Sequence, residues 1–373
     1  MRRFRSRVFA FFETGKSTSG QRFYGALATK INACLETDSS TAPLILFNVS
    51  APLFELLECR FRGQGIFVRV DGVYFDRLSV GFLSSLRTPL RLLFGLAPKR
   101  GVLNRFACDI ANLINENYGA FARILLADGL IYQSEYSRRM HARYFCWKPA
   151  ITICNGANFV ADGSPAASSS IELVTIYDDW RPTKRIPELV EFVHWARRVK
   201  DMEINLTILG YNGRLPRCTD STLRTKIEAC AYIRTLSRFR EFGDEHKQAL
   251  RQADMYITFT YRDACPNAVI EAMARGLPVV AAASGGIPDI VKDAGVLVKC
   301  DDGTEYFTAA RFENVFPCID YHEVLAAIKK VKGQNAYFRK CVRDRFSKDL
   351  NLDIVATRYM SALLGWGGDE TVI

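Results

Sequence analysis

Paired cysteines, long apolar runs and compositionally biased tracts are absent from this chain of 373 residues. Its 11 cysteines are odd in number and scattered without a Cys-x-x-Cys pair, which argues against a zinc site or a disulfide framework. No apolar run is long enough to span a membrane. The run that follows the basic first residues stops at Glu13, which is too short for a secretion signal. We therefore expect a globular protein in a reducing, cytoplasmic setting.

Negative charge is scarce in the first half of the chain. Residues 1–160 contain 21 Lys and Arg against 11 Asp and Glu, whereas residues 161–373 contain 29 of each class. The surplus is densest in residues 77–108, which hold six cations, no carboxylate and many apolar side chains. This composition suits peripheral contact with an anionic membrane or a lipid-phosphate acceptor, and it equally suits a core-packed helix with a solvated basic face. No nucleic-acid-binding motif accompanies it, so we expect no nucleic acid as a partner.

Strand-like and helical patterns alternate along both halves of the chain. This order predicts an α/β fold with two domains and a cleft between them rather than one large sheet. A run of small residues at 161–170 has the composition of a linker. We place a first domain at 1–165, a second at 166–340, and a terminal segment at 341–373. An amphipathic pattern at 337–364 predicts a helix leading into that last segment.

One passage in the second half indicates a chemistry. It begins with a β-branched and aromatic run at 255–260, which predicts a buried parallel strand. Pro266 then stands where the first turn of a helix accepts proline. The loop 261–265 between strand and helix falls at the carboxyl edge of the predicted sheet, where ligands bind in doubly wound folds. Backbone N–H groups at the start of the helix, on Asn267 and Ala268, favour an anion such as phosphate.

Two carboxylates flank that phosphate position, Asp263 in the loop and Glu271 in the helix. Carboxylates accept hydrogen bonds from hydroxyl groups and would repel the phosphate itself. Hydroxyl-rich groups attached to a diphosphate describe a nucleotide sugar. Taken alone, the pair is explained equally well by an ordinary solvated loop and helix, so the flanking sequence has to decide between the two.

The sequence that follows the pair matches a known pattern. Residues 271–280 read Glu-Ala-Met-Ala-Arg-Gly-Leu-Pro-Val-Val, and residues 285–289 read Gly-Gly-Ile-Pro-Asp. With two carboxylates separated by seven residues, this passage resembles the donor-site signature of family-4 retaining glycosyltransferases. The resemblance implies the GT-B fold, in which two Rossmann-like α/β domains face each other across a cleft. It also implies a C-terminal helix that crosses back onto the first domain.

In that family the second carboxylate binds the ribose hydroxyls and the first approaches the transferred sugar. The resemblance therefore implies these contacts for Glu271 and Asp263, and further donor contacts for Cys265, Asn267 and Ala268. The family usually has two glutamates and a Gly-x-Pro sequence, where this chain has an aspartate followed by Ala-Cys-Pro. These departures keep an alternative open, a GT-B-like nucleotide-sugar-binding protein with a degenerate, inactive site.

Other landmarks occur in the order that the resemblance implies. Arg181, Lys184 and Arg185 form a cationic loop between a strand-like run and a helical pattern. The resemblance assigns Arg181 and Lys184 to the donor diphosphate, with Arg185 a weaker candidate, and charged donors of this kind would also stabilise the leaving diphosphate. Gly20 stands where the family has a glycine-rich loop that faces the donor.

Many members of the family place a histidine near the reacting carbon, at the end of a mid-domain strand. None of the 4 histidines of this chain stands at such a position. Asp71 follows the strand-like run 65–70 at the comparable place, so we name it as an acceptor-side or catalytic residue. A helix cap or a turn is the alternative role for this carboxylate.

The sequence therefore predicts a retaining hexosyltransferase-like enzyme of glycan biosynthesis. It would move a sugar from a UDP- or GDP-linked donor to a glycan, a lipid-linked glycan or a protein glycan. The chain has no Asp-x-Asp motif, and the family it resembles usually works without a metal. We expect no metal and no cofactor beyond the donor substrate, because cationic side chains and the start of the helix meet the diphosphate charge.

Overall fold

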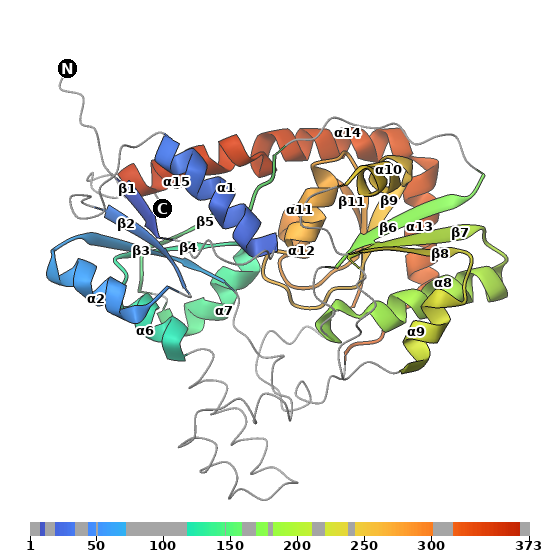
Figure 1. Ribbon diagram of the computed structural model, residues 1–373, viewed down its shortest axis with the longest axis horizontal. Coiled ribbons are helices and arrows are strands. Elements are labelled where there is room, and N and C mark those ends of the chain that lie inside the picture. The colour runs from blue at the N-terminus through green and yellow to red at the C-terminus, as the bar shows by residue number, and fades with distance from the viewer. Residues whose placement is uncertain are drawn as a thin grey trace, which may run out of the picture.

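The computed structural model describes residues 8–11, 19–33, 44–49, 51–71, 118–145, 147–158, 169–177, 182–210, 221–237, 243–300 and 316–365. These residues form two parallel sheets, one in each half of the chain, with helices on both faces of each sheet (Figure 1).

The first sheet has the strand order β1-β2-β3-β4-β5, and every neighbouring pair is parallel. Successive side chains of a strand point to opposite faces, so Phe67 packs on the α1 side and Val68 on the side of α2 and α6. The elements of this domain are β1 (Val8–Phe11), α1 (Ser19–Ala33), β2 (Leu44–Asn48), α2 (Leu53–Phe61), β3 (Gly65–Val70), α6 (Tyr118–Leu126), β4 (Gly129–Tyr132), α7 (Glu135–Phe145) and β5 (Ala150–Thr152).

The second sheet has the order β11-β10-β9-β6-β7-β8 and is parallel throughout. The chain enters at β6, builds outward through β7 and β8, and then returns to the other side of β6 with β9. Its elements are β6 (Ile171–Ile176), a 3-10 turn (Pro182–Lys184), α8 (Ile186–Lys200), β7 (Ile204–Leu209), α9 (Ser221–Glu228), β8 (Ile233–Leu236), α10 (Asp244–Gln252), β9 (Met255–Thr258), α11 (Asn267–Met273), β10 (Val279–Ala282), α12 (Ile287–Val291), β11 (Gly295–Val298) and α13 (Tyr321–Gly333).

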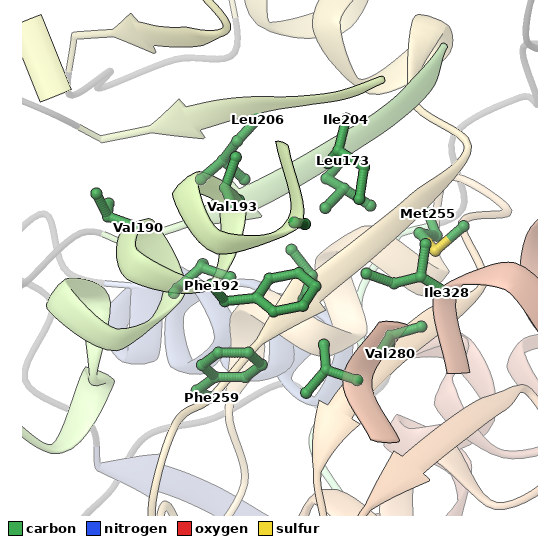
Figure 2. Packing of buried hydrophobic residues seen from close by; sticks show 14 of the residues in the cluster. Leu173, Val190, Phe192, Val193, Ile204, Leu206, Met255, Phe259, Val280 and Ile328 are labelled. Carbon is green, nitrogen blue, oxygen red and sulfur yellow. The ribbon is translucent and has the colours of Figure 1, made fainter. Parts of the chain in front are cut away.

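The apolar face of α8 anchors one side of the second sheet. Its Val190 and Val193 are fully buried, and they are three residues apart, as an amphipathic helix requires. Figure 2 shows the ring of Phe192 turned towards that of Phe259, which follows β9; the centroids are 6.1 Å apart at 68°. This edge-to-face contact holds α8 over the strand that leads into the site loop.

The C-terminal helices connect the two halves. After α14 (Asn335–Arg345) and a π-helical turn (Phe346–Leu350), α15 (Leu352–Gly365) runs beside α1 over the first sheet (Figure 1). Val355 and Tyr359 of α15 pack in one apolar cluster with Phe23 and Leu27 of α1. The predicted α/β fold, with two Rossmann-like domains and a helix crossing back, is confirmed.

The predicted boundaries of the elements hold in some places and shift in others. The expected strand at 65–70 coincides with β3, whereas the strand expected at 255–260 ends at Thr258 as β9. The single helix expected at 337–364 is interrupted at 346–351. There the N–H of Ala157 donates to Leu350 O and the N–H of Leu352 donates to Ala157 O, so the segment that connects the two domains bonds to the backbone at the break. Helix α1 begins at Ser19, so Gly20 lies in its first turn rather than in a loop.

Two predicted features fall outside the described residues. They are the small-residue linker, apart from residues 169 and 170, and the basic segment 77–108. The proposed limits of the domains therefore stay predictions. None of the helices among the described residues combines the length and apolar content needed to cross a membrane.

Candidate donor site

The candidate site lies at the carboxyl ends of β6 and β9. The strand order reverses between these two neighbours, and in an open α/β sheet the crevice at such a switch point is where ligands bind. Lys184 ends the 3-10 turn after β6, and Asp263 lies in the loop after β9. Their side chains form an ion pair, with Nζ to Oδ2 at 2.8 Å and side-chain exposures of 14% and 26%. Two residues predicted for one donor are thus brought together across 79 positions of sequence.

Backbone contacts hold the two loops side by side. The N–H of Tyr261 donates to the carbonyl of Thr183 at 2.8 Å, directly before Lys184. Arg262 follows in the left-handed region, with φ 53°, and its N–H donates to Ser284 Oγ at 3.0 Å. A non-glycine residue in this region stores backbone strain that the surrounding contacts must offset, which is typical of functional loops.

Gly285 and Gly286 explain why the sequence has two glycines after β10. A Cβ on Gly285, where φ is 61°, would stand 2.3 Å from Asp263 O, and one on Gly286 would stand 1.9 Å from Ala264 O. The N–H of Gly286 donates to Asp263 O at 2.8 Å. The glycine pair therefore supports the Asp263 loop by close backbone approach.

Asp263 is oriented by two contacts. Its Oδ2 accepts from Lys184, and its Oδ1 accepts from the backbone N–H of Cys265 at 3.2 Å, which closes the loop on itself. Such a side-chain bond two residues ahead is the usual local role of aspartate in a turn. The carboxylate is thus held in place in the loop after β9.

Glu271 lies about one turn into α11, which begins at Asn267 with Pro266 as its N-cap. Its carboxylate is near Arg275 in the next turn. Burial lowers the pKa of Arg275, and the Glu271 carboxylate opposes that shift. Glu271 and Asp263 thus belong to the strand-loop-helix unit that the sequence predicts.

Two further residues predicted at the donor contact the first domain. Asn267 Oδ1 accepts from Asn155 Nδ2 at 2.7 Å, and the sulfur of Cys265 accepts from the backbone N–H of Asn155 at 3.4 Å. Ala268 packs at the edge of the apolar cluster beneath the helix. The connection between the domains therefore touches the start of α11 directly.

Arg185 is buried beside the site rather than open to it. Only 2% of its surface is exposed, and its guanidinium donates to Glu188 and, at 2.7 Å, to the carbonyl of Pro317. These contacts account for its position at the start of α8, so a role at the diphosphate stays a prediction. Arg181 lies outside the described residues, and Gly20 lies in α1.

Asp71 directly follows β3 and belongs to a buried polar network. Its Oδ1 accepts from Arg69 Nη1 at 3.0 Å, from Tyr24 Oη at 3.1 Å, and from Gln133 Nε2. Arg69 is wholly buried, lies over the ring of Tyr24, and also donates to Tyr359 of α15 and to Asn155. This environment is that of a structural ion pair, and an acceptor-side role for Asp71 stays a prediction.

Sequence reasoning missed Arg69 and Asn155. A charged side chain inside the apolar strand Gly-Ile-Phe-Val-Arg-Val was the available signal for Arg69, because a buried charge must find partners. The Asn-Gly pair at 155–156 has the sequence of a turn. Gly156 in fact admits the crossing helix, since a Cβ there would lie 2.9 Å from Leu350 O.

Comparison with known proteins finds one family model and one curated relative that match parts of the chain. The model of the family described as glycosyl transferases group 1 matches residues 178–312, about a third of the chain. A sulfoquinovosyl transferase of Arabidopsis thaliana, SQD2, is 45% identical over 51 residues. That match covers 14% of this chain and 10% of the relative, so the chain shares only a short segment with a longer protein. The family match falls on the second domain and includes both Lys184 and Asp263.

Solved structures resemble the chain over nearly its whole length. The pneumococcal O-GlcNAc transferase GtfA, solved with UDP and GlcNAc, has a TM-score of 0.54 at 16% identity, covering 86% of this chain and 56% of that one. HepE of Anabaena, solved with UDP, has a TM-score of 0.56 at 13% identity, covering 91% and 82%. WaaG, a glycosyltransferase involved in lipopolysaccharide biosynthesis, has a TM-score of 0.55 at 11% identity, covering 97% and 100%. These likenesses establish the GT-B fold.

Proposed function

We propose that this protein is a retaining glycosyltransferase that uses a nucleoside-diphosphate sugar as donor. The donor binds at the carboxyl edge of the second sheet, and the sugar passes to a glycan or lipid-linked acceptor at the first domain. The observation that carries the proposal is the Lys184–Asp263 pair at the switch point between β6 and β9, inside the segment that matches a glycosyltransferase family. A cation and a carboxylate side by side suit a ligand that joins phosphate to hydroxyl-bearing sugar.

The pair has a defined task when the donor binds. A diphosphate carries more negative charge than one carboxylate, so the Lys184 ammonium turns from Asp263 to the diphosphate and stabilises the charge that grows on it as the glycosidic bond breaks. Asp263 then accepts a hydrogen bond from a sugar hydroxyl, and Glu271 accepts from the ribose hydroxyls. Arg181 is the proposed second cation. UDP is the first nucleotide to test, since two proteins of similar fold were solved with it.

A transfer assay with UDP- and GDP-linked sugars tests the proposal. Turnover of one donor is expected for the wild type, and Lys184→Ala and Glu271→Ala are each expected to lose it. The anomeric configuration of the product, read by NMR, tests retention. Near-normal rates in both variants would remove the assignment of the site.

A degenerate nucleotide-sugar-binding site is the second candidate, and one observation favours it. Both oxygens of Asp263 are already engaged, by Lys184 and by the N–H of Cys265, and aspartate is one methylene shorter than the usual glutamate. Tight binding of UDP or GDP without turnover of any linked sugar would favour this candidate over transfer.

Peripheral contact of residues 77–108 with an anionic membrane belongs to the proposal on composition alone. Sedimentation with vesicles tests it. Binding to vesicles that contain anionic lipid, and not to neutral ones, is the expected result, whereas equal binding to both would contradict the contact.

A further inference from the structure

A chain of polar side chains runs from the interior of the first domain to the start of α11. Arg69 Nη2 donates to Asn155 Oδ1, and Asn155 Nδ2 donates to Asn267 Oδ1 at 2.7 Å. Arg69 has 0% of its surface exposed and Asn155 has 3%. Arg69 and Asn155 are therefore shielded from water, and water does not readily replace the hydrogen bonds between them.

The direction of every bond in this chain is determined by chemistry. A guanidinium can only donate, so the amide of Asn155 must turn its oxygen to Arg69 and its NH₂ group to Asn267. Asp71 supplies a second constraint, because a carboxylate only accepts. Gln133 therefore turns its NH₂ to Asp71, and its Oε1 faces Asn155 Nδ2 at 3.5 Å. Both neighbours of Asn155 thus favour the same orientation of its amide.

The orientation of Asn155 decides that of Asn267. Because Asn267 Oδ1 must accept from Asn155, the NH₂ group of Asn267 is left to donate to a different partner. Among the described residues, none accepts a hydrogen bond from that NH₂ group, and the residue is half-buried. It stands four positions after Asp263, on the same loop-helix unit as the proposed donor site.

We infer that Asn155 is a positioning residue for the donor site: held by Arg69, it fixes the amide of Asn267 with its NH₂ group towards acceptor oxygens of the bound nucleotide. This inference rests on the proposed function. With the opposite orientation, Asn267 would present its carbonyl oxygen to the same acceptors and repel them. The first domain thereby sets the polarity of a contact made in the second.

Asn155→Asp is the variant that reverses this polarity with little change of shape. Aspartate still accepts from Arg69 but cannot donate to Asn267, so Asn267 turns its NH₂ group inward and its oxygen to the ligand. We expect the melting temperature to stay within a few degrees of the wild type, since Arg69 keeps a partner. We expect the Kd for UDP or GDP, by isothermal titration calorimetry, to rise about tenfold, the factor that corresponds to about 1.4 kcal/mol.

The row of hydrogen bonds from Arg69 through Asn155 to Asn267 is called the relay below. A double-mutant cycle separates its effect on binding from the effect of the negative charge that Asn155→Asp adds. With Asn267→Ala there is no amide at position 267 for Asn155 to orient, so Asn155→Asp should then change the Kd by less than about threefold. Asn205→Asp is the matched control, because Asn205 also accepts from an arginine, Arg197, and donates to a third group, Glu172, away from the site. It should lower stability and leave the Kd within about twofold.

The outcomes separate the inference from the proposed function. If the wild type binds neither UDP nor GDP, the donor site itself is refuted. If the wild type binds one of them and Asn155→Asp weakens binding by the same factor in both backgrounds, or not at all, the relay is refuted while the donor site stands. If Asn155→Asp weakens binding when Asn267 is present and leaves the Kd nearly unchanged in the Asn267→Ala background, the result supports both the inference and the donor site.

Discussion

Each domain places an ion pair at the carboxyl ends of its parallel strands, and the two pairs differ in what surrounds them. Arg69 and Asp71, at the end of β3, have side-chain exposures of 0% and 21%, and the guanidinium is engaged by Tyr24, Tyr359 and Asn155 as well. Lys184 and Asp263, after β6 and β9, are exposed by 14% and 26%, and the lysine is a single flexible cation.

The contrast follows from the chemistry of the two cations. Arginine spreads five donors over a rigid plane and suits a site where several fixed acceptors must be satisfied at once. Lysine carries one compact charge on a flexible stem, which can leave one carboxylate for a better anion. We therefore expect the pair of the first domain to hold structure together and the proposed donor-site pair of the second to be available to a ligand.

Arg69→Met gives the largest expected effect and tests the structural half of the contrast. Removing one partner of a buried pair leaves an uncompensated charge, so we expect the free energy of unfolding to fall by about 3–5 kcal/mol. Urea denaturation measures this. Arg60→Met is the control in the same domain, since the Arg60–Asp128 pair is exposed by 44% and 36% and should cost at most about 1 kcal/mol. Equal decreases in the free energy of unfolding of the two variants would contradict a special structural role for the buried Arg69–Asp71 pair.

Lys184→Ala tests the functional half. Loss of a cation that stabilises a leaving group lowers turnover by roughly 100-fold or more, with little change in melting temperature. Lys226→Ala provides the comparison, because Lys226 pairs with Glu191 on the exposed surface, each with 46% exposure. A steady-state assay should find Lys226→Ala at wild-type rate. A Lys184→Ala enzyme as fast as this control would show that the second pair is structural too.

Gly286→Ala sharpens the account of how the Asp263 loop is supported. A Cβ at 1.9 Å from Ala264 O forces a backbone shift, and we expect the free energy of unfolding to fall by about 3 kcal/mol. Gly25→Ala, where a Cβ meets nothing within 4 Å inside α1, should instead stabilise by about 0.5–1 kcal/mol. If both substitutions stabilise the protein in thermal unfolding, the close approach is not a constraint.

His141 gives the smallest effect and belongs to the first domain. Burial lowers its pKa to about 4, below the usual 6.5, and its Nδ1 lies 2.9 Å from Ser137 O. The unfolded chain therefore binds a proton that the folded chain resists, so stability falls as pH drops from about 6.5 towards 4. The loss should reach about 2 kcal/mol between pH 7 and pH 5. His141→Gln should flatten this slope in denaturation at the two pH values, and an unchanged slope would assign it to other groups.

The part of the candidate site that is contiguous in the chain could be predicted from the sequence. The run 255–260, the proline at 266 and the flanking glycines encode a strand, a loop and a helix that are contiguous in the chain, so Asp263 and Glu271 could be placed before the structure. Lys184 required the resemblance as well, because its contact with Asp263 depends on the neighbouring positions of β6 and β9.

The first domain could be predicted only in outline. Arg69 meets Tyr359 across 290 positions, and Asn155 meets Asn267 across 112, so neither contact leaves a periodic or compositional pattern. The break between α14 and α15 was missed for the same reason. It depends on backbone bonds with Ala157, a residue of the interdomain connection, and on Asn351, whose Oδ1 accepts from the N–H of Asp353 at the start of α15.

Calorimetric titration of UDP and GDP into the wild type, Lys184→Ala and Lys226→Ala tests the central claim most directly, which is that the switch point between β6 and β9 is a nucleotide-sugar donor site. The account predicts that one nucleotide binds the wild type and the Lys226 variant equally and binds the Lys184 variant at least about tenfold more weakly. Binding that is the same in all three proteins, or absent from the wild type, would contradict it.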